Sequence, residues 1–428
     1  MRIGLVNEYF PPFAPGGAEW SSLALAQGLA EQHDVRVITP NYGADAVESI
    51  RGVEVRRFPS PVQLTGQAVT VHMRWLANLG FYQRVAAAIT TAAREKPFDV
   101  LHVQAKYSLP GAYWAAHRLG VPLAYTIRDT SILCPTGQCL MEYEPVHVGC
   151  GRFSFWWQSC RRLYMDRYMQ DVPQRWRIQL ALLWQQAHVR LFRAALQRAD
   201  GVIGVSKGIL QIYQAAGLQL GQRSAVIYNL PPLNNDVDGE LINIVKQTYD
   251  ISDAPTVLYA GKFSLGKGTQ MLVQAADQVI QYIPSAQFLF AGHGTIQLTG
   301  VHTRNVGRLP HEHLQALYHL ADVVVIPSVW PEPLSRVGLE AMAAGKPLIG
   351  TNVGGTREQI EDGVTGYLVP RKDPTALAQA IIKLLSDDSL RQSMGNAAQK
   401  CVATKFSYKV NLQKMQDFYD ILQKEPRS

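Results

Sequence analysis

The sequence predicts an α/β protein built from two domains with parallel sheets. In both halves of the 428-residue chain, short buried-type strands alternate with helical segments, as in parallel sheets covered by helices. A Pro/Asn/Asp-rich stretch near residue 235 has the composition of a linker. The hydrophobic fraction of 47% is enough for substantial cores. We therefore expect two α/β domains of similar size that face each other across a cleft at their strand ends.

The first half opens with a strand, a loop, a helix and a second strand. These are predicted for IGLVNEYF, PPFAPGGAEW, SSLALAQGLAEQ and DVRVITP. Further strands are predicted for FDVLHVQ, VPLAYTIRD and DGVIGVS, with the helix GAYWAAHRLG between the first two. The second half continues with strands at TVLYAGKF, AQFLFAGHG, DVVVIPS and PLIGTNVGG.

Composition excludes some classes of protein and leaves others open. The formal net charge of +7 favours acidic partners, such as sugar nucleotides, anionic lipid surfaces or nucleic acid. No stretch approaches the roughly 18 to 20 uncharged apolar residues of a membrane span. The N-terminal apolar run is interrupted at Glu8 and by two prolines, which argues against a signal peptide. We expect a cytoplasmic protein.

Two features of the first half each have two interpretations. Cys134, Cys139, Cys150 and Cys160 lie in one segment, but none of their spacings is the C-x-x-C pair of a zinc site, so metal ligands and ordinary thiols both remain open. The segment from Cys160 to Arg198 interleaves arginines and tryptophans with an apolar helical pattern. It is either a solvated basic face with buried aromatics or a surface for anionic lipid or an anionic acceptor.

Two glycine-containing loops are suited to phosphate. Gly16 and Gly17 stand between a strand and a helix, where the backbone can approach an anion at the helix N-terminus, although a tight turn without a ligand looks similar. GKFSLGKG, residues 261–268, matches the first seven positions of a P-loop, but Gly268 replaces the Ser or Thr that holds magnesium. This argues against an NTPase. Lys262 and Lys267 can still neutralise a diphosphate, unless both simply face solvent.

The run PEPLSRVGLE places two carboxylates seven residues apart. Glu332 lies between two prolines on a loop after a buried strand, and Glu340 lies in the following helix. We expect them to contact two different parts of one ligand. The amides of Leu334, Ser335, Arg336 and Val337 at the helix start would face the charged middle of that ligand.

These motifs together resemble glycosyltransferase family four, the retaining sugar-nucleotide transferases of the GT-B fold. The resemblance rests on PEPLSRVGLEAMAAGKPLIGTNVGG with GKFSLGKG, VIYN, PPFAPGGAE and the DVLH strand, and it runs over nearly the whole chain. It implies two Rossmann-like domains: residues 1–235 for the acceptor, with an insert at about 130–198, and residues 236–405 for the donor. A C-terminal helix at 406–428 would cross back to the first domain.

The resemblance also implies roles for individual residues. Glu332, with Pro333 and Leu334, would contact the donor sugar, and Glu340 the nucleotide ribose. The donor diphosphate would be held by Gly16, Gly17, Lys262, Lys267, Ser335 and Val337. Lys262 stands where the family has Arg, so it keeps the charge but loses the bidentate fork.

A further departure from the family concerns the pattern T-x-H-D. Arg128 replaces its His in YTIRDTSILCP, while Asp129 is retained. Because Arg does not release its proton, a proton-shuttling role is excluded there, whereas an electrostatic role toward phosphate or sugar remains. Glu332, Lys267 and Arg128 are thus the residues expected to act in catalysis.

The function implied is a retaining, hexosyltransferase-type transfer from a nucleotide-diphosphate sugar to a glycan, lipid-linked or small-molecule acceptor, in polysaccharide or glycoconjugate biosynthesis. No metal, cofactor or nucleic acid is expected, and no D-x-D pattern follows a strand. Peripheral binding to an anionic membrane is a further hypothesis. The alternatives are a catalytically silent sugar-nucleotide-binding subunit and a sugar-nucleotide epimerase of similar fold.

Overall fold

The computed structural model describes residues 1–64, 70–135, 153–168, 174–220, 223–232, 237–298, 300 and 302–424. The chain divides into two compact units. Unit 1 consists of Met1–Leu230 and Asn411–Ser428, and unit 2 consists of Pro231–Val410. The division after Leu230 falls within the Pro/Asn/Asp-rich stretch.

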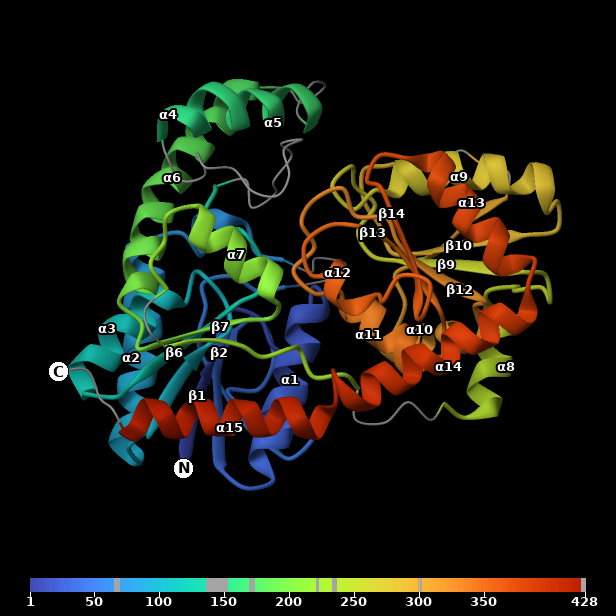
Figure 1. The fold of residues 1–428 in the computed structure, drawn as a ribbon. Coiled ribbons are helices and arrows are strands. Elements are labelled where there is room, and N and C mark those ends of the chain that lie inside the picture. The colour runs from blue at the N-terminus through green and yellow to red at the C-terminus, as the bar shows by residue number, and fades with distance from the viewer. Residues whose placement is uncertain are drawn as a thin grey trace. The chain divides into compact units, whose positions relative to one another are not determined.

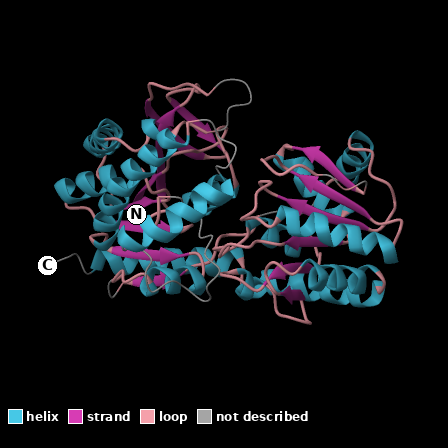
Figure 2. Ribbon diagram, turned by 90° about the horizontal axis from the view of Figure 1, so that it is seen from above, coloured by secondary structure: helices cyan, strands magenta, loops and turns pink. Residues whose placement is uncertain are grey.

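Unit 1 is built on a mostly parallel sheet. Among the described residues its strand order is β3-β4-β2-β1-β5-β6-β7-β8, and β3 pairs antiparallel with β4 at one edge. The inner strands β1, β5 and β6 are buried along their whole length because helices cover both faces of the sheet (Figure 2). The strands are β1 (Arg2–Val6), β2 (Asp34–Asn41), β3 (Val47–Ile50), β4 (Val53–Pro59), β5 (Val100–Val103), β6 (Leu123–Ile127), β7 (Gly201–Gly204) and β8 (Ser224–Val226).

The helices of unit 1 include the connections between these strands and two longer segments. They are α1 (Gly17–Ala30), the 3₁₀ turn η1 (Met73–Trp75), α2 (Leu79–Glu95), α3 (Leu109–Leu119), α4 (Phe153–Phe155), the π-helical turn η2 (Trp156–Cys160), α5 (Arg161–Tyr168), α6 (Arg175–Gln197), α7 (Lys207–Ala215) and α15 (Tyr408–Lys424). In Figure 1, α6 is a long helix that extends along unit 1.

The C-terminal helix α15 packs against the sheet of unit 1, although the chain before it belongs to unit 2 (Figure 1). Its Tyr419 hydroxyl lies 2.6 Å from Nδ1 of His102 on β5, and both residues are fully buried. Burial lowers the pKa of His102 to about 3, so the ring is neutral. A Cβ on Gly201 would lie 2.6 Å from the ring of Phe418, so glycine allows the helix its close approach to β7.

Unit 2 is a second parallel sheet, with the strand order β11-β10-β9-β12-β13-β14 among its described residues. Its strands are β9 (Thr256–Ala260), β10 (Gln287–Ala291), β11 (Thr303–Gly307), β12 (Val323–Ile326), β13 (Leu348–Thr351) and β14 (Gly366–Val369). Its helices are α8 (Gly239–Thr248), α9 (Thr269–Tyr282), α10 (His311–Leu320), α11 (Arg336–Ala343), α12 (Thr356–Gln359), α13 (Pro374–Leu385) and α14 (Asp388–Thr404).

The core of unit 2 lies between its sheet and the helices α9 and α13. Buried side chains from β9, β10 and β12 pack there with those of both helices. The core leaves the carboxyl ends of the strands to polar loops, which is where open α/β sheets bind ligands. No helix in the described part of the chain is long and apolar enough to span a membrane.

Candidate active site

The loop between β9 and α9 carries both predicted lysines of unit 2. The carbonyl oxygen of Gly266 accepts hydrogen bonds from the amides of Val329 (2.9 Å) and Trp330 (3.2 Å). This ties the loop to the chain that follows β12. Lys262 is exposed, whereas Lys267 is half-buried, so the structure separates the two lysines.

Gly268 explains why this loop departs from a P-loop. The residue precedes α9 with a φ of 71°, and a Cβ there would lie 1.7 Å from the carbonyl oxygen of Pro327. Ser or Thr therefore does not fit without a shift of the backbone. The hydroxyl that holds magnesium in a P-loop is incompatible with this packing.

Glu332 and Lys267 come together at the carboxyl end of the sheet. Nζ of Lys267 lies 2.7 Å from Oε2 of Glu332 and 5.0 Å from the ring centroid of Trp330. The same oxygen accepts hydrogen bonds from the Ser328 hydroxyl (2.9 Å) and the Trp330 indole (3.1 Å). Oε1 of Glu332 accepts none from the residues that the structure describes. One carboxylate oxygen is thus held in place, and the other is available to a hydroxyl donor.

The surroundings keep the Glu332 carboxyl ionised. Burial alone would raise its pKa, but the Lys267 ammonium and the three hydrogen bonds to Oε2 outweigh burial and hold the pKa below its usual value. Gly354 supports the backbone beneath this side chain: at a φ of 47°, a Cβ there would lie 2.4 Å from the carbonyl oxygen of Glu332. The carboxylate is therefore charged and fixed.

Glu340 belongs to a separate network. His311 and Arg336 contact its Oε1 through Nε2 (3.0 Å) and Nε (2.7 Å), and the Tyr318 hydroxyl donates to Oε2 (3.0 Å). Burial would raise the pKa of Glu340, but Arg336 and these hydrogen bonds lower it overall. Both oxygens already have partners and the side chain is buried. The lone pairs that remain are what Glu340 could offer a ribose hydroxyl.

The start of α11 offers a diphosphate fewer unpaired backbone amides than the sequence predicted. The Ser335 amide donates to Oε1 of Gln359 (2.9 Å), and the Ser335 hydroxyl accepts from the Gly338 amide (3.2 Å) as the N-cap. The Ser335 amide is therefore occupied, contrary to the expectation that it faces a diphosphate. Val337 is half-buried, and its amide has no partner in the described part of the chain. Pro333 is half-buried and Leu334 is buried beside them.

In unit 1, Arg128 follows β6 and is held by two neutral side chains. Its Nε and Nη2 donate to Oε1 of Gln104 (3.1 and 2.5 Å), and its Nη1 donates to Oδ1 of Asn229. Gln104 and Asn229 lie just beyond β5 and β8. The guanidinium is thus oriented by amides at the carboxyl end of the sheet, while Asp129 is exposed.

Gly16 and Gly17 lie at the exposed start of α1. The Gly16 amide donates to Oε2 of Glu19 (3.0 Å), and a Cβ on Gly16 would meet only that oxygen, 3.8 Å away. Burial raises the pKa of Glu19 to about 7. The local packing within unit 1 does not itself require glycine at position 16.

Two family models match the chain over long segments. The glycosyl transferase 4-like domain matches residues 16–229, and the glycosyl transferases group 1 model matches residues 243–401. The first alone covers half of the 428 residues. The chain is a member of the glycosyltransferase family.

Relatives of this glycosyltransferase match it over different lengths. An uncharacterized glycosyltransferase of Methanocaldococcus jannaschii is 28% identical over 426 residues, covering 95% of each chain. The alpha-D-kanosaminyltransferase of Streptomyces kanamyceticus is 33% identical over 173 residues, which are 38% of this chain and 45% of that enzyme. The chain therefore matches less than half the length of this second relative.

Solved structures establish the fold of the transferase. HepE of Anabaena, in complex with UDP and glucose, superposes with a TM-score of 0.71 at 19% identity, over 99% of this chain and 100% of that one. Sucrose-phosphate synthase from Thermosynechococcus elongatus gives a TM-score of 0.71 at 19% identity, over 99% of both chains. The two parallel-sheet units are the Rossmann-like domains of the GT-B fold, as predicted.

Sequence reasoning missed several polar residues of the transferase's unit 1. Glu8 is buried beyond β1 and accepts hydrogen bonds from the amides of Tyr107 and Ser108 (3.2 Å for the second). Burial raises the pKa of Glu8 to about 7, although Lys106 and these amides oppose the shift. Gln104, Lys106 and Asn229 share this edge. A sequence signal was present for Glu8, Gln104 and Lys106, because each follows a buried strand within three residues, whereas Asn229 follows the half-buried β8.

The cysteine segment is only partly described. Cys134 and Cys160 pack against a small apolar cluster of Trp156, Met165 and Leu182. Cys139 and Cys150 lie outside the described residues. Among the residues that are described, no three His, Cys, Asp or Glu side chains gather as a metal site.

Proposed function

We propose that this glycosyltransferase moves a hexose from a UDP-sugar to a glycan, lipid-linked or small-molecule acceptor, with retention of configuration and without a metal ion. The observation that carries the proposal is the Lys267–Glu332 pair, a fixed ammonium and carboxylate at the carboxyl end of the unit 2 sheet. UDP is the first nucleotide to test because HepE, of the same fold, was solved with UDP and with UDP-glucose.

Each charged group has a role in this proposal. Lys267 stabilises the departing diphosphate, and Lys262, exposed on the same loop, reaches toward it as a second cation. Oε1 of Glu332 accepts a hydrogen bond from a sugar hydroxyl beside Pro333 and Leu334. Glu340 accepts from a ribose hydroxyl, and the Val337 amide donates to the diphosphate.

The first unit contributes a cation and a helix N-terminus. Arg128 remains protonated, so its role is electrostatic, toward phosphate or sugar. The exposed start of α1 at Gly16 and Gly17 offers backbone amides to an anion. These cations and amides take the place that magnesium has in other transferases.

The bond changes can be written without an enzyme nucleophile. The bond from the anomeric carbon to the diphosphate oxygen breaks, and the acceptor hydroxyl forms its new bond on the same face of the sugar. The departing phosphate oxygen accepts the proton of that hydroxyl. Charge on the leaving oxygen grows in the transition state, which is where the Lys267 contact strengthens.

The test combines donors, acceptors and a chelator. Purified protein is incubated with UDP-glucose, other UDP-sugars and a GDP-sugar, with alkyl and aryl glycoside acceptors, and UDP release and product configuration are followed by NMR. We expect a retained product whose yield is unchanged in EDTA. An inverted product, or activity lost in EDTA and restored by manganese, would falsify the mechanism. Donor binding without turnover indicates a silent subunit, and a changed sugar still joined to its nucleotide indicates an epimerase.

We also propose that α6 contacts an anionic membrane. Trp176, Leu180 and Trp184 recur every four residues, so they share one helix face, and they are 59%, 56% and 57% exposed. The hypothesis of buried aromatics does not fit the two tryptophans. Arg177 lies over the Trp176 ring, 5.3 Å from its centroid. Tryptophan with flanking arginine suits a lipid interface, and each arginine near an anionic surface contributes about 1 kcal/mol.

Vesicle co-sedimentation tests this contact. We expect binding to anionic but not to neutral vesicles, weakened by salt, and lost in a Trp176→Ser/Trp184→Ser variant. Ile244→Ser is the matched control, because Ile244 is an exposed apolar side chain on α8 of unit 2. Equal sedimentation with both kinds of vesicle would contradict the proposal.

A further inference from the structure

Trp330 lies at the Lys267–Glu332 pair but has no part in the bond changes proposed above. It stands on the loop after β12, two residues before Glu332. Position 330 precedes Pro331, and the residue before a proline favours an extended backbone. Side chains two residues apart on an extended chain point to the same side. The local sequence therefore favours an indole and a carboxyl on one side of the loop.

The indole of Trp330 contacts both members of the ion pair. Its Nε1–H donates to Oε2 of Glu332 (3.1 Å), and Nζ of Lys267 lies over its ring, 5.0 Å from the centroid. A hydrogen bond to a carboxylate is among the stronger hydrogen bonds in proteins. An ammonium over an indole is attracted by the negative face of the ring. One side chain thus holds an anion by its edge and a cation by its face.

The backbone of Trp330 is tied to the loop that carries Lys267. Its amide donates to the carbonyl oxygen of Gly266 (3.2 Å), the residue directly before Lys267. The Lys267 amide in turn donates to the Ser264 hydroxyl (3.3 Å). Because both backbones are held, the indole meets the ammonium from a fixed position.

Packing alone does not account for a tryptophan at this position. Trp330 is half-buried, and among the described residues it does not belong to the core between the sheet, α9 and α13. A phenylalanine would offer a ring without the N–H, and a leucine would offer neither polar contact. The residue type therefore fits its contacts with the charged pair.

A neutral partner also preserves the charges that a ligand would use. In the described part of the chain, Lys267 has one carboxylate partner, Glu332, and the ring supports the ammonium without cancelling its charge. On Glu332, the donors Lys267, Ser328 and Trp330 all meet Oε2. Their convergence on one oxygen turns Oε1 toward other donors.

We infer that Trp330 is a positioning residue of this site, whose N–H holds Glu332 for the donor sugar and whose ring holds Lys267 for the leaving diphosphate. The roles of the two charged groups rest on the glycosyl transfer proposed above. The two contacts of the indole do not depend on it.

The indole N–H signals in an NMR spectrum test the contact with Glu332 without any donor. The chain has eight tryptophans, and the signal of Trp330 is the one that Trp330→Phe removes. Donation to a carboxylate moves an N–H signal downfield, so Glu332→Gln should move this signal upfield more than any of the other seven. The other seven signals report that the variants are folded. A Trp330 signal that Glu332→Gln leaves in place overturns the inference.

Steady-state kinetics with UDP-glucose separates the two contacts. Trp330→Phe keeps a ring and removes the N–H, so the KM for the donor should rise about threefold while kcat is nearly unchanged. Trp330→Leu also removes the ring, and its kcat should fall about tenfold further, because the Lys267 contact strengthens in the transition state. Equal kcat values for the two variants overturn the role of the ring.

Ser328→Ala provides a matched comparison at the same carboxylate. The Ser328 hydroxyl is the other neutral donor to Oε2 of Glu332, at 2.9 Å. Its loss should resemble that of the Trp330 N–H, with a raised KM and little change in kcat. A fall in kcat as large as that of Trp330→Leu would show that the ring over Lys267 has no separate effect.

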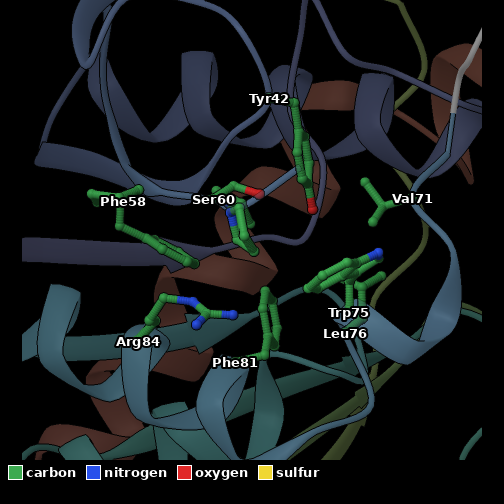
Figure 3. Close-up of a pocket in the computed structure, with 11 residues that line it drawn as sticks. Tyr42, Phe58, Ser60, Val71, Trp75, Leu76, Phe81 and Arg84 are labelled. Carbon is green, nitrogen blue, oxygen red and sulfur yellow. The ribbon is translucent and has the colours of Figure 1, made fainter. Parts of the chain in front are cut away.

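Trp75→Phe is the matched control for the substitution itself. The ring of Trp75 also lies near a cation, with Cζ of Arg74 5.2 Å from its centroid. Trp75 belongs to unit 1, where it lines a small pocket with Leu76 and Phe81 (Figure 3). The same change there should alter neither KM nor kcat. Equal effects of Trp75→Phe and Trp330→Phe overturn the inference.

The two kinds of measurement separate this inference from the proposed function. If Trp330→Leu lowers only the melting temperature, with KM and kcat as in the wild type, Trp330 is a packing residue and the proposed transfer stands. If the Trp330 signal responds to Glu332→Gln but no donor is turned over, the proposed transfer fails and the contact of Trp330 with the pair stands.

Discussion

At the carboxyl edge of unit 1, the buried carboxyl of Glu8 accepts hydrogen bonds from backbone amides, and its pKa is raised to about 7. At the same edge of unit 2, the buried carboxyls of Glu332 and Glu340 contact Lys267 and Arg336, and their pKa values are lowered. Burial acts in the same direction in all three cases. The difference teaches that a cation in direct contact, as Lys267 and Arg336 are, outweighs burial, whereas Lys106 near Glu8 only reduces the upward shift.

The same contrast applies to the cations. Lys267 is paired with a carboxylate in unit 2, whereas the guanidinium of Arg128 in unit 1 is bonded to the amide oxygens of Gln104 and Asn229. In unit 2, a ligand that binds Lys267 would therefore contact an ammonium that is already paired with Glu332. In unit 1, the amide oxygens of Gln104 and Asn229 orient the Arg128 guanidinium. The predictions below test whether this difference has consequences for activity and stability.

The largest effect is expected for Lys267→Ala. Turnover should fall by about a hundredfold or more, because the contact to the leaving diphosphate is strongest in the transition state. Lys262→Ala, on the exposed lysine of the same loop, should cost less than tenfold. Steady-state kinetics with the best donor measures both. Turnover of Lys267→Ala within threefold of the wild type would show that the pair is structural.

Glu340→Ala should weaken nucleotide binding by roughly tenfold to a hundredfold, through lost hydrogen bonds worth about 1.5 to 3 kcal/mol. Titration calorimetry with UDP measures the change. Glu312→Ala is the control, because Glu312 is exposed on α10. Unchanged UDP affinity with a lower melting temperature would mean that Glu340 only holds Arg336, His311 and Tyr318 in place.

Glu8→Gln should alter how stability depends on pH. The folded pKa of about 7 lies above the ordinary 4.5, so wild-type stability from this group is complete below pH 4.5 and is lost as pH rises to 7. The variant should lack this loss, which is on the order of 1 to 3 kcal/mol. Urea unfolding at pH 5 and pH 8 measures it. Parallel pH profiles for variant and wild type would contradict the assignment.

The contributions of Glu332 and Glu340 to stability should change with pH in the opposite direction to that of Glu8. Their lowered pKa values contribute stability above the ordinary carboxyl value, and this stability is lost as pH falls through the folded values. Glu332→Gln should therefore reduce the acid sensitivity of unfolding, measured in the same urea series. If this variant lost stability more steeply on acidification than the wild type, the lowered pKa of Glu332 would be wrong.

The smallest effect is expected for Gly16→Ala. The φ of Gly16 is −160° and a Cβ there meets only a side-chain oxygen, so the free energy of unfolding should change by less than about 0.5 kcal/mol. Gly354→Ala in unit 2 should cost about 1 to 3 kcal/mol, because its Cβ would lie 2.4 Å from the Glu332 carbonyl oxygen. Denaturant unfolding compares the two. A KM for donor raised by Gly16→Ala at unchanged stability would support backbone approach of a ligand.

Much of the fold could be predicted from the sequence, because buried parallel strands are nearly continuous apolar runs. The strand at β12 and the helix at α11 lie where DVVVIPS and VGLEAMAAG indicated them. The antiparallel edge strand β3, whose VESI sequence has two adjacent polar residues and no alternation, was not expected. Its short, exposed pairing gives little apolar signal.

The candidate site could be predicted where its residues belong to short sequence motifs. The Glu332 and Lys267 motifs are short, and the structure brings their side chains together across 65 residues. The Ser335 amide shows the limit, since its partner Gln359 lies 24 residues away and no pattern links the two. The contacts of Gln104 and Asn229 with Arg128 were not predicted, because they depend on which strand ends are neighbours, and strand order is a tertiary property.

The return of α15 to unit 1 has a consequence for how the chain is made. Unit 2 is one continuous segment, Pro231–Val410, whereas unit 1 needs residues from both ends of the chain. A ribosome completes all of unit 2 before it supplies Tyr419, whose hydroxyl meets His102 inside the core of unit 1. Of the two units, the one that is begun first is therefore finished last, and until α15 is synthesised it exposes the face of β7 at Gly201 that Phe418 later covers.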